Sequence, residues 1–222
     1  MKQKFAAEFI GSMLLVMSTI GSMIMFTRTI GGDKNVALLA NAIAVAFILT
    51  ALIEIFGPIS GAHFNPIVTL IMWLEQQIST PDALKFVLVQ ILGGILGTAV
   101  IHLKFWEDMG GVFFISGNVR NGSLYFGELV ATFILILVIL MLGKVKSSTP
   151  SLMVGFLVGG QIMATSSTIF ANPQVTIARI LTSADSGIRP VDAAVFILMQ
   201  LIGALVAYAI YRLFFKATSV PS

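Results

Sequence analysis

The feature that most constrains this chain is a series of long apolar runs. A run of about twenty apolar residues is long enough to cross a bilayer core of roughly 30 Å as a helix. Of the 222 residues, 57% are hydrophobic and only 10% are charged, a balance that would leave a soluble protein too little polar surface to cover its core. We therefore expect an all-α membrane protein. Six full spans are expected, at about Phe5 to Phe26, Val36 to Phe56, Ala83 to Leu103, Leu124 to Gly143, Ser151 to Phe170 and Val191 to Phe215.

Composition excludes several other classes of protein. The chain has no cysteine, so disulfides, thiolate metal sites and thiol catalysis are all excluded. The formal net charge of +3 is small and dispersed, which argues against a nucleic-acid partner. The sequence shows no nucleophile and base at a catalytic spacing and no metal-ligand spacing. We expect no enzymatic activity, no catalytic residues, no metal and no cofactor.

An even number of spans places both termini on the same side of the membrane. We expect the first apolar run to be retained as a helix, because it is too long for a signal peptide. Counted with the N-terminus inside, the basic residues favour the inside by seven to six. The inner group is Lys2, Lys4, Lys85, Lys144, Lys146, Arg212 and Lys216, and the outer group is Arg28, Lys34, Lys104, Arg120, Arg179 and Arg189. The prediction is a multi-pass protein of the cell membrane with both termini in the cytoplasm.

Two shorter apolar segments follow the second and fifth spans, and each opens with an Asn-Pro pair. They are Pro66 to Leu74 and Pro173 to Leu181, each of nine residues. At about 1.5 Å per residue such a segment crosses less than half the membrane, so it must enter and turn back as a half-helix. Proline suits the first helical turn, and the preceding asparagine is a favoured N-cap. Each pair therefore predicts a helix start at mid-membrane, where irregular backbone needs protein or a water-filled cavity around it.

The same order of features occurs twice along the chain. Glu8 near the start of span one corresponds to Glu128 in span four, and the two Asn-Pro pairs correspond to each other. Gln90 to Gly94 in span three corresponds to Gln200 to Ala204 in span six. An odd number of full spans in each half places the halves in opposite orientations. We expect one transmembrane domain over residues 1–222, with inverted repeats over about 1–105 and 120–216.

These residues resemble the aquaporin, or major intrinsic protein, family over nearly the whole chain. The resemblance lies in the two Asn-Pro boxes, in the paired glutamates, and in the segments Phe9 to Ser12, Ile59 to Pro66 and Gln90 to Gly94. It implies an aquaporin-like fold of six transmembrane helices and two re-entrant half-helices. It also implies a homotetramer in the lipid bilayer with one pore in each subunit.

Asn65 and Asn172 are expected at the centre of that pore. Two helix N-termini aimed at one point create a positive region that repels cations. Both side-chain amides can donate hydrogen bonds to a passing water or hydroxyl oxygen, which interrupts a water wire. If the two asparagines only capped their helices and met no water or solute, burying their polar side chains at mid-membrane would cost free energy. The other residues expected at the pore centre are Pro66, Pro173, Ile67 and Gln174, of which the last two replace the usual alanines of the family; Gln174 either adds a polar contact or fills a gap.

Three residues are expected to support the re-entrant loops. In the family, the counterparts of Glu8 and Glu128 accept hydrogen bonds from loop N–H groups that lack partners. We favour this role over a proton relay, because neither glutamate has an obvious cationic partner. His63, which is common at its position in the family, is expected to shape the cytoplasmic vestibule rather than to bind metal.

The selectivity filter departs from the family pattern. The third residue after the second box asparagine is usually arginine, and here it is Val175. Counting from the boxes places the other filter positions at Val45, Gly160 and Ile169, which makes the filter aliphatic. Loss of a guanidinium widens the opening and lowers the penalty for apolar solute surface. The alternative is a degenerate pore that conducts poorly.

Arg179 lies four residues beyond Val175 in the same half-helix, and therefore on the same helix face. One hypothesis is that it lines the outer vestibule and partly replaces the absent charge. The alternative that we favour from the sequence is an arginine at a helix end that complements the helix dipole, pairs with Asp185 or extends toward the membrane surface.

The segment Asn172 to Arg179, followed by Gly187 to Pro190, is similar to a bacterial aquaglyceroporin-like group associated with arsenic resistance. That similarity implies a passive channel for water and small neutral solutes, either glycerol-like polyols or metalloid hydroxides such as arsenous acid. A water-selective aquaporin is the first alternative. A secondary transporter or an ion channel with an inverted-repeat fold is the second, and a transporter would show saturable uptake.

Overall fold

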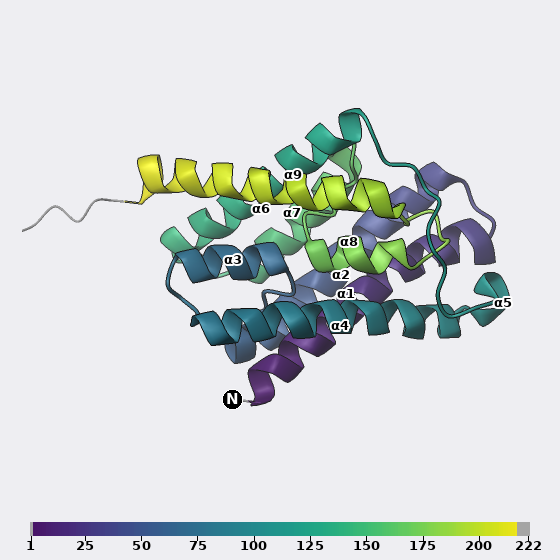
Figure 1. Cartoon of the computed structure of the whole chain (residues 1–222), viewed down its shortest axis with the longest axis horizontal. Coiled ribbons are helices and arrows are strands. Elements are labelled where there is room, and N and C mark those ends of the chain that lie inside the picture. The colour runs from purple at the N-terminus through teal and green to yellow at the C-terminus, as the bar shows by residue number, and fades with distance from the viewer. Residues whose placement is uncertain (1, 217–222) are drawn as a thin grey trace, which may run out of the picture.

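Two short helices that lie end to end organise the structure. The computed structural model describes residues 2–216, and α3 (Pro66–Leu74) and α8 (Pro173–Ile180) run in line between the long helices (Figure 1). In each, the asparagine before the first proline caps the helix, because its side chain accepts a hydrogen bond from the backbone N–H two residues later. Proline fits the first position, where its missing N–H has no intrahelical partner.

The long helices surround this pair. Five helices, counted over the described residues and including two π-helical turns, are long and apolar enough to cross a membrane. In chain order the elements are α1 (Lys2–Ile24) with the π-helical turn Met25–Thr29, α2 (Lys34–Ser60), α4 (Thr80–Lys104), α5 (Trp106–Met109), α6 (Ser123–Lys144), α7 (Pro150–Ala164) and α9 (Pro190–Ile210) with the π-helical turn Tyr211–Phe215. The prediction of an all-α, aquaporin-like membrane fold is confirmed.

The fifth predicted span is shorter as a helix than the sequence indicated. The apolar run was expected to be helical from Ser151 to Phe170, but α7 has 15 residues and ends at Ala164. The polar residues Thr165 to Thr168 follow, and they compete with helical hydrogen bonding through their hydroxyl groups. The rest of the run forms an irregular loop that leads directly into α8.

The helices pack in matching pairs, because α1 packs against α4 as α6 packs against α9. Glycine makes each pair possible. A Cβ atom at Gly93 of α4 would collide with the carbonyl oxygen of Phe9, and one at Gly203 of α9 would collide with that of Leu129. Phe9 follows Glu8 and Leu129 follows Glu128, so the two close approaches are at corresponding positions.

Gly203→Ala is expected to destabilise the protein by about 1–3 kcal/mol, since the added methyl group meets backbone that cannot rotate away. The midpoint of thermal unfolding of the purified protein in detergent measures this effect. Gly143→Ala is the matched control, because a Cβ atom there has nothing within 4 Å. Equal midpoints for the two variants would contradict the packing argument.

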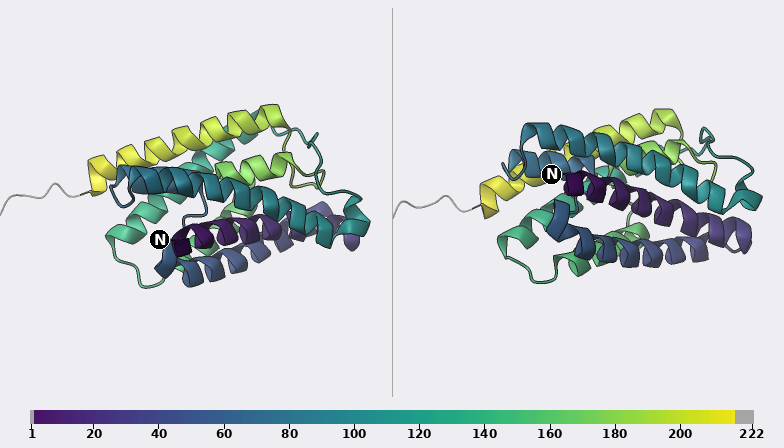
Figure 2. Two further views of the ribbon diagram at one scale, coloured as in Figure 1. Left: turned by 60° about the horizontal axis from the view of Figure 1, so that its bottom comes forward. Right: turned by 90° about the horizontal axis from the view of Figure 1, so that it is seen from below.

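The two ends of the described chain lie at the same end of the helix bundle (Figure 2). We call this the terminal end; it carries the ion pairs of Lys4 with Asp82 and of Lys216 with Glu75. The other end, which we call the loop end, carries α5 and the segment 110–122 (Figure 1).

Candidate functional site: a cavity along the helix bundle

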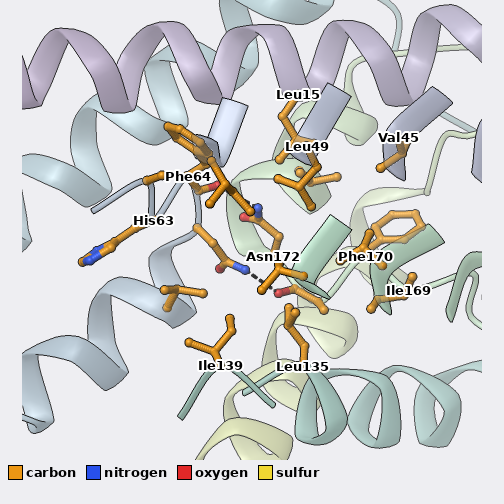
Figure 3. Close-up of a pocket in the computed structure, with 18 of the residues that line it drawn as sticks. Leu15, Val45, Leu49, His63, Phe64, Leu135, Ile139, Ile169, Phe170 and Asn172 are labelled. Atoms are coloured by element: carbon orange, nitrogen blue, oxygen red, sulfur yellow. Dashed lines mark hydrogen bonds between the residues drawn. The ribbon is translucent and has the colours of Figure 1, made fainter. Parts of the chain in front are cut away.

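A cavity of about 430 Å³ runs between the helices from the terminal end toward the loop end. Its walls are mostly aliphatic, and Leu15 and Leu49 face Leu135 and Ile139 across it (Figure 3). The long helices contribute residues spaced by about one turn, namely Leu15 and Thr19 of α1, Val45, Leu49, Ile53 and Gly57 of α2, Leu135 and Ile139 of α6, and Pro150, Val154, Val158 and Ile162 of α7. Leu15 and Leu135 each lie seven residues beyond the glutamate of their half.

Two strips of irregular backbone complete the wall, residues 61–65 and 169–172. Left-handed backbone occurs at corresponding places in them: Ala62 and Phe64 have φ of 50° and 45°, and Ile169 and Ala171 have φ of 36° and 45°. Such angles are strained for residues with a Cβ atom. Among the described residues, the strip carbonyls of Ala62 and Ile169 accept no hydrogen bond. Free carbonyls at membrane depth require a water-filled cavity.

Glu8 and Glu128 hold these two strips in place. The carboxylate of Glu8 accepts from the backbone N–H groups of His63 at 3.0 Å and Phe64 at 2.7 Å. That of Glu128 accepts from those of Phe170 at 3.1 Å and Ala171 at 2.5 Å. A glutamine side chain also donates to each glutamate. Gln90 Nε2 lies 2.7 Å from Glu8 Oε2, and Gln200 Nε2 lies 2.7 Å from Glu128 Oε1. Both glutamates are fully buried.

Asn65 and Asn172 join the two half-helices at their N-terminal ends. The Nδ2 of Asn65 donates to the carbonyl oxygen of Ala171 at 2.7 Å, and that of Asn172 donates to the carbonyl oxygen of Phe64 at 2.8 Å. Both side chains line the cavity, and Asn172 projects into the middle of it (Figure 3). An amide nitrogen carries two hydrogens, so each asparagine keeps one donor for a molecule in the cavity.

The other residues assigned to the pore centre lie behind the asparagines. Pro66, Pro173, Ile67 and Gln174 are absent from the cavity wall. They were expected at the pore centre, and the junction of the two half-helices holds them next to the asparagines but off the cavity wall. Gln174 makes a polar contact rather than only filling space: its Nε2 donates to the carbonyl oxygen of Phe64 at 3.2 Å, beside the bond from Asn172.

His63 lines the cavity near its terminal end. Its Nδ1 lies 3.0 Å from Thr69 Oγ1, and its ring meets that of Phe86 edge to face. The backbone N–H of His63 donates to the carboxylate of Glu8. The corresponding residue in the second half, two positions before Asn172, is Phe170.

Of the four predicted filter residues, Val45, Ile169 and Val175 line the cavity. Gly160 does not: it is exposed, and a Cβ atom there would have nothing within 4 Å. The cavity residues of α7 next to it are Val158 and Ile162, and a position midway between them faces the opposite side of the helix. Counting across a loop of unknown length misplaced this residue, whereas the spacing of four in α7 could have located the apolar face.

Arg179 also lines the cavity, and it does not pair with Asp185. Asp185 instead binds Lys34, with 2.7 Å between Nζ and Oδ1, and this hydrogen bond holds the pKa of Asp185 below its ordinary value. The guanidinium carbon of Arg179 lies 4.0 Å from the centre of the Phe170 ring. The favoured alternative from the sequence was therefore wrong about Asp185, although Arg179 does lie in the last turn of α8.

Arg120 links loop segments at the loop end through hydrogen bonds. Its guanidinium donates to the carbonyl oxygens of Gly187 at 2.9 Å, Asp185 at 3.3 Å and Ser167 at 3.4 Å. Burial lowers the pKa of Arg120. These contacts tie the segment 110–122 both to the loop after α8 and to the loop that carries Ile169. The sequence offered no signal for this role beyond the presence of an arginine between two spans.

The fold and the cavity together define a class of protein. A helix bundle of membrane-spanning length encloses an aliphatic cavity with unpartnered carbonyls along it and two opposed helix N-termini at its centre. This is the architecture of a membrane channel. The described residues contain no group of three or more His, Cys, Asp or Glu side chains that could hold a metal ion.

Comparison with known proteins identifies the family. The model of the family described as major intrinsic protein matches residues 1–169, and the chain belongs to this family of membrane channels. The resemblance noted from the Asn-Pro boxes is thus confirmed.

Individual relatives are consistent with this assignment. The chain is 39% identical over 211 residues to aquaglyceroporin AqpS of Rhizobium meliloti (strain 1021), an alignment that covers 95% of this chain and 89% of that protein. It is 31% identical over 143 residues to glycerol uptake facilitator protein-like 6 of Lactiplantibacillus plantarum, covering 62% of each. Among solved structures, that of the aquaglyceroporin from Plasmodium falciparum matches with a TM-score of 0.70 and 21% identity over 96% of both chains, a similarity of fold.

Proposed function

We propose that this channel conducts water and small neutral solutes of the glycerol type through the cavity. The observation that carries the proposal is the aliphatic part of the cavity wall formed by Val45, Ile162, Ile169 and Val175, which we assign as the constriction near the loop end. Ile162 takes the place that the sequence assigned to Gly160, since it is the last cavity residue of α7. These four side chains present carbon to a passing solute, which favours molecules that carry carbon as well as hydroxyl groups.

Polar groups on the other part of the wall complement the hydroxyl groups of such a solute. The free carbonyls of the two strips accept hydrogen bonds, and the asparagines donate them. A polyol therefore exchanges its water shell for acceptors and donors along the path while its carbon atoms contact aliphatic side chains. At the centre of the path a bare cation meets the positive ends of α3 and α8, which repel it, whereas a neutral solute is not repelled there. This asymmetry supports passage of neutral solutes.

The same constriction suits metalloid hydroxides such as arsenous acid. Arsenous acid is a neutral polyhydroxy molecule of about the size of glycerol. The aliphatic wall and the polar groups of the cavity should therefore admit both solutes. Aquaglyceroporin AqpS, 39% identical to this chain, belongs by its name to the glycerol-conducting type. We include metalloid hydroxides in the proposed solute class on this basis.

We also propose the arrangement of the channel in the membrane. The corresponding bonds of Glu8 and Glu128 support inverted repeats over about residues 1–105 and 120–216 within one domain. The terminal end, with its basic residues, is placed in the cytoplasm. A homotetramer with one pore per subunit is supported by the complete cavity within a single chain and by exposed apolar side chains on α2 and α7, such as Phe47 and Phe156.

Val175→Arg tests the filter. In proteoliposomes under osmotic gradients, the wild type is expected to pass water, glycerol and arsenous acid with flux that rises linearly with gradient. The variant is expected to keep water flux and to lower glycerol and arsenous acid flux by about tenfold, because a guanidinium narrows the aliphatic constriction.

Leu103→Arg is the matched control, because Leu103 is exposed at the end of α4 near the loop end and lies off the cavity wall. It adds the same charge at the same end and is expected to behave as the wild type. Equal glycerol flux through wild type and Val175→Arg would reject the proposed filter. Wild-type liposomes that swell only in water gradients would identify a water-selective channel, and saturating flux would identify a transporter.

A further inference from the structure

The guanidinium of Arg179 is buried in the cavity wall. Only 4% of the residue is exposed. In residues 2–216 it forms no salt bridge, and its Nε is buried with no hydrogen-bond acceptor. A buried charge that is neither paired nor hydrogen-bonded is strongly unfavourable. Because Arg179 lines the cavity, the natural partner for its donors is a molecule inside the cavity.

The position of the guanidinium is set by an aromatic platform. Its carbon lies 4.0 Å from the centre of the Phe170 ring, a distance typical of stacking. Phe170 is itself fixed, since its backbone N–H donates to Glu128 and its ring packs against Phe196 at 5.2 Å between centroids. Stacking occupies the face of the guanidinium and leaves the N–H groups around its edge free to donate.

The internal correspondence of the halves places Arg179 at a wall position. In α3 the third and seventh residues after Asn65 are Val68 and Met72, and both line the cavity. In α8 the third and seventh residues after Asn172 are Val175 and Arg179, and both line it as well. The charge thus lies one helical turn, about 6 Å, beyond Val175, the position where the family usually has arginine.

We propose that Arg179 is the residue that binds solute oxygen atoms at the loop end of the channel and excludes cations there. Arg179 lies one turn farther out than Val175, against the Phe170 ring. From there it supplies the positive charge and hydrogen-bond donors that a valine side chain lacks. A neutral polyol or metalloid hydroxide presents its oxygens to the guanidinium while its remaining surface faces the aliphatic constriction. This inference rests on the proposed function, because it assumes that such solutes pass through the cavity.

Three substitutions separate the charge of Arg179 from its hydrogen-bond donors. Arg179→Lys keeps a charge, Arg179→Gln keeps donors without charge, and Arg179→Met removes both at similar length. Two readouts are needed for each: potassium current across planar bilayers, and the ratio of glycerol to water permeability in proteoliposomes. Lys34→Gln is the control, because it removes a positive charge at the same end from a side chain that is 76% exposed and off the cavity wall.

Potassium current is expected to follow the charge. It should rise about tenfold in Arg179→Gln and Arg179→Met and stay near the wild-type value in Arg179→Lys and Lys34→Gln. The glycerol-to-water ratio is expected to follow the donors, falling about tenfold in Arg179→Met and less in Arg179→Gln. Because two uncharged variants are used, failure of one of them to fold leaves the comparison with Arg179→Lys intact.

The inference is overturned if both readouts are the same in wild type and in every folded Arg179 variant, or if Lys34→Gln changes the potassium current as much as Arg179→Gln does. A wild type that passes no glycerol would instead reject the proposed function itself. The two failures are therefore distinguishable in one set of measurements.

Discussion

Glu128→Leu is expected to abolish conduction and to remove most of the folded protein from the membrane fraction. The substitution leaves three buried N–H groups without an acceptor: the backbone N–H groups of Phe170 and Ala171 and one N–H of the Gln200 side-chain amide, whose other N–H donates to Thr176. Each orphaned donor costs roughly 1–3 kcal/mol. The sum is comparable with a net stability of about 5–15 kcal/mol. The released segment is also the strained strip that lines the cavity, with left-handed backbone at Ile169 and Ala171.

Membrane-fraction yield and water flux per unit of protein measure this effect. Glu8→Leu is expected to give the same loss, because Glu8 makes the corresponding bonds to His63 and Phe64. Glu107→Gln is the control: this carboxylate is exposed at the loop end, where its neutralisation should change neither quantity. Wild-type yield and flux in Glu128→Leu would show that the loop does not depend on the carboxylate.

Leu49→Trp is expected to lower the flux of water and of glycerol by more than about tenfold while the protein still folds. Leu49 projects into the cavity from α2 (Figure 3) and is only 8% exposed. An indole at this position occupies space that a solute needs, whereas the cavity of about 430 Å³ can accept the larger ring without displacing backbone.

Leu88→Trp on α4 is the matched control. Leu88 is 58% exposed and lies off the cavity wall, so the same exchange there should leave both fluxes unchanged. Stopped-flow light scattering of proteoliposomes with equal protein content gives both permeabilities. Undiminished flux in a folded Leu49→Trp variant would mean that solutes do not use this cavity.

Features that depend on local interactions were predictable from the sequence. An Asn-Pro pair specifies a capped helix start within a few residues, which is why α3 begins at the predicted residue and α8 does too. The correspondence of Glu8 with Glu128 was visible as a repeat, and the structure gives both side chains the same kind of bonds. The length of α7 was less predictable, because its apolar run continues past the hydroxyl-rich segment that ends the helix.

Features that depend on which helices meet were not predictable in the same way. Gly160 was assigned to the filter by counting, but the rotation of α7 about its axis is set by how it packs on α2, where Gly155 and Gly159 allow close approach. Gln174 could not be given a partner until α8 was placed opposite the carbonyl of Phe64.

The sequence by itself determined that this chain lies in a membrane and that two half-helices meet within it. Both follow from hydropathy, caps and spacing, which are properties of neighbouring residues. The resemblance to the family added that Val175 stands where arginine is usual. Only the tertiary structure decided that Asp185 pairs with Lys34 and that Arg179 faces the cavity on the Phe170 ring, with no ion-pair partner in residues 2–216. The pairing of a charge depends on distances between residues far apart in the chain, and those distances exist only once the helices have packed.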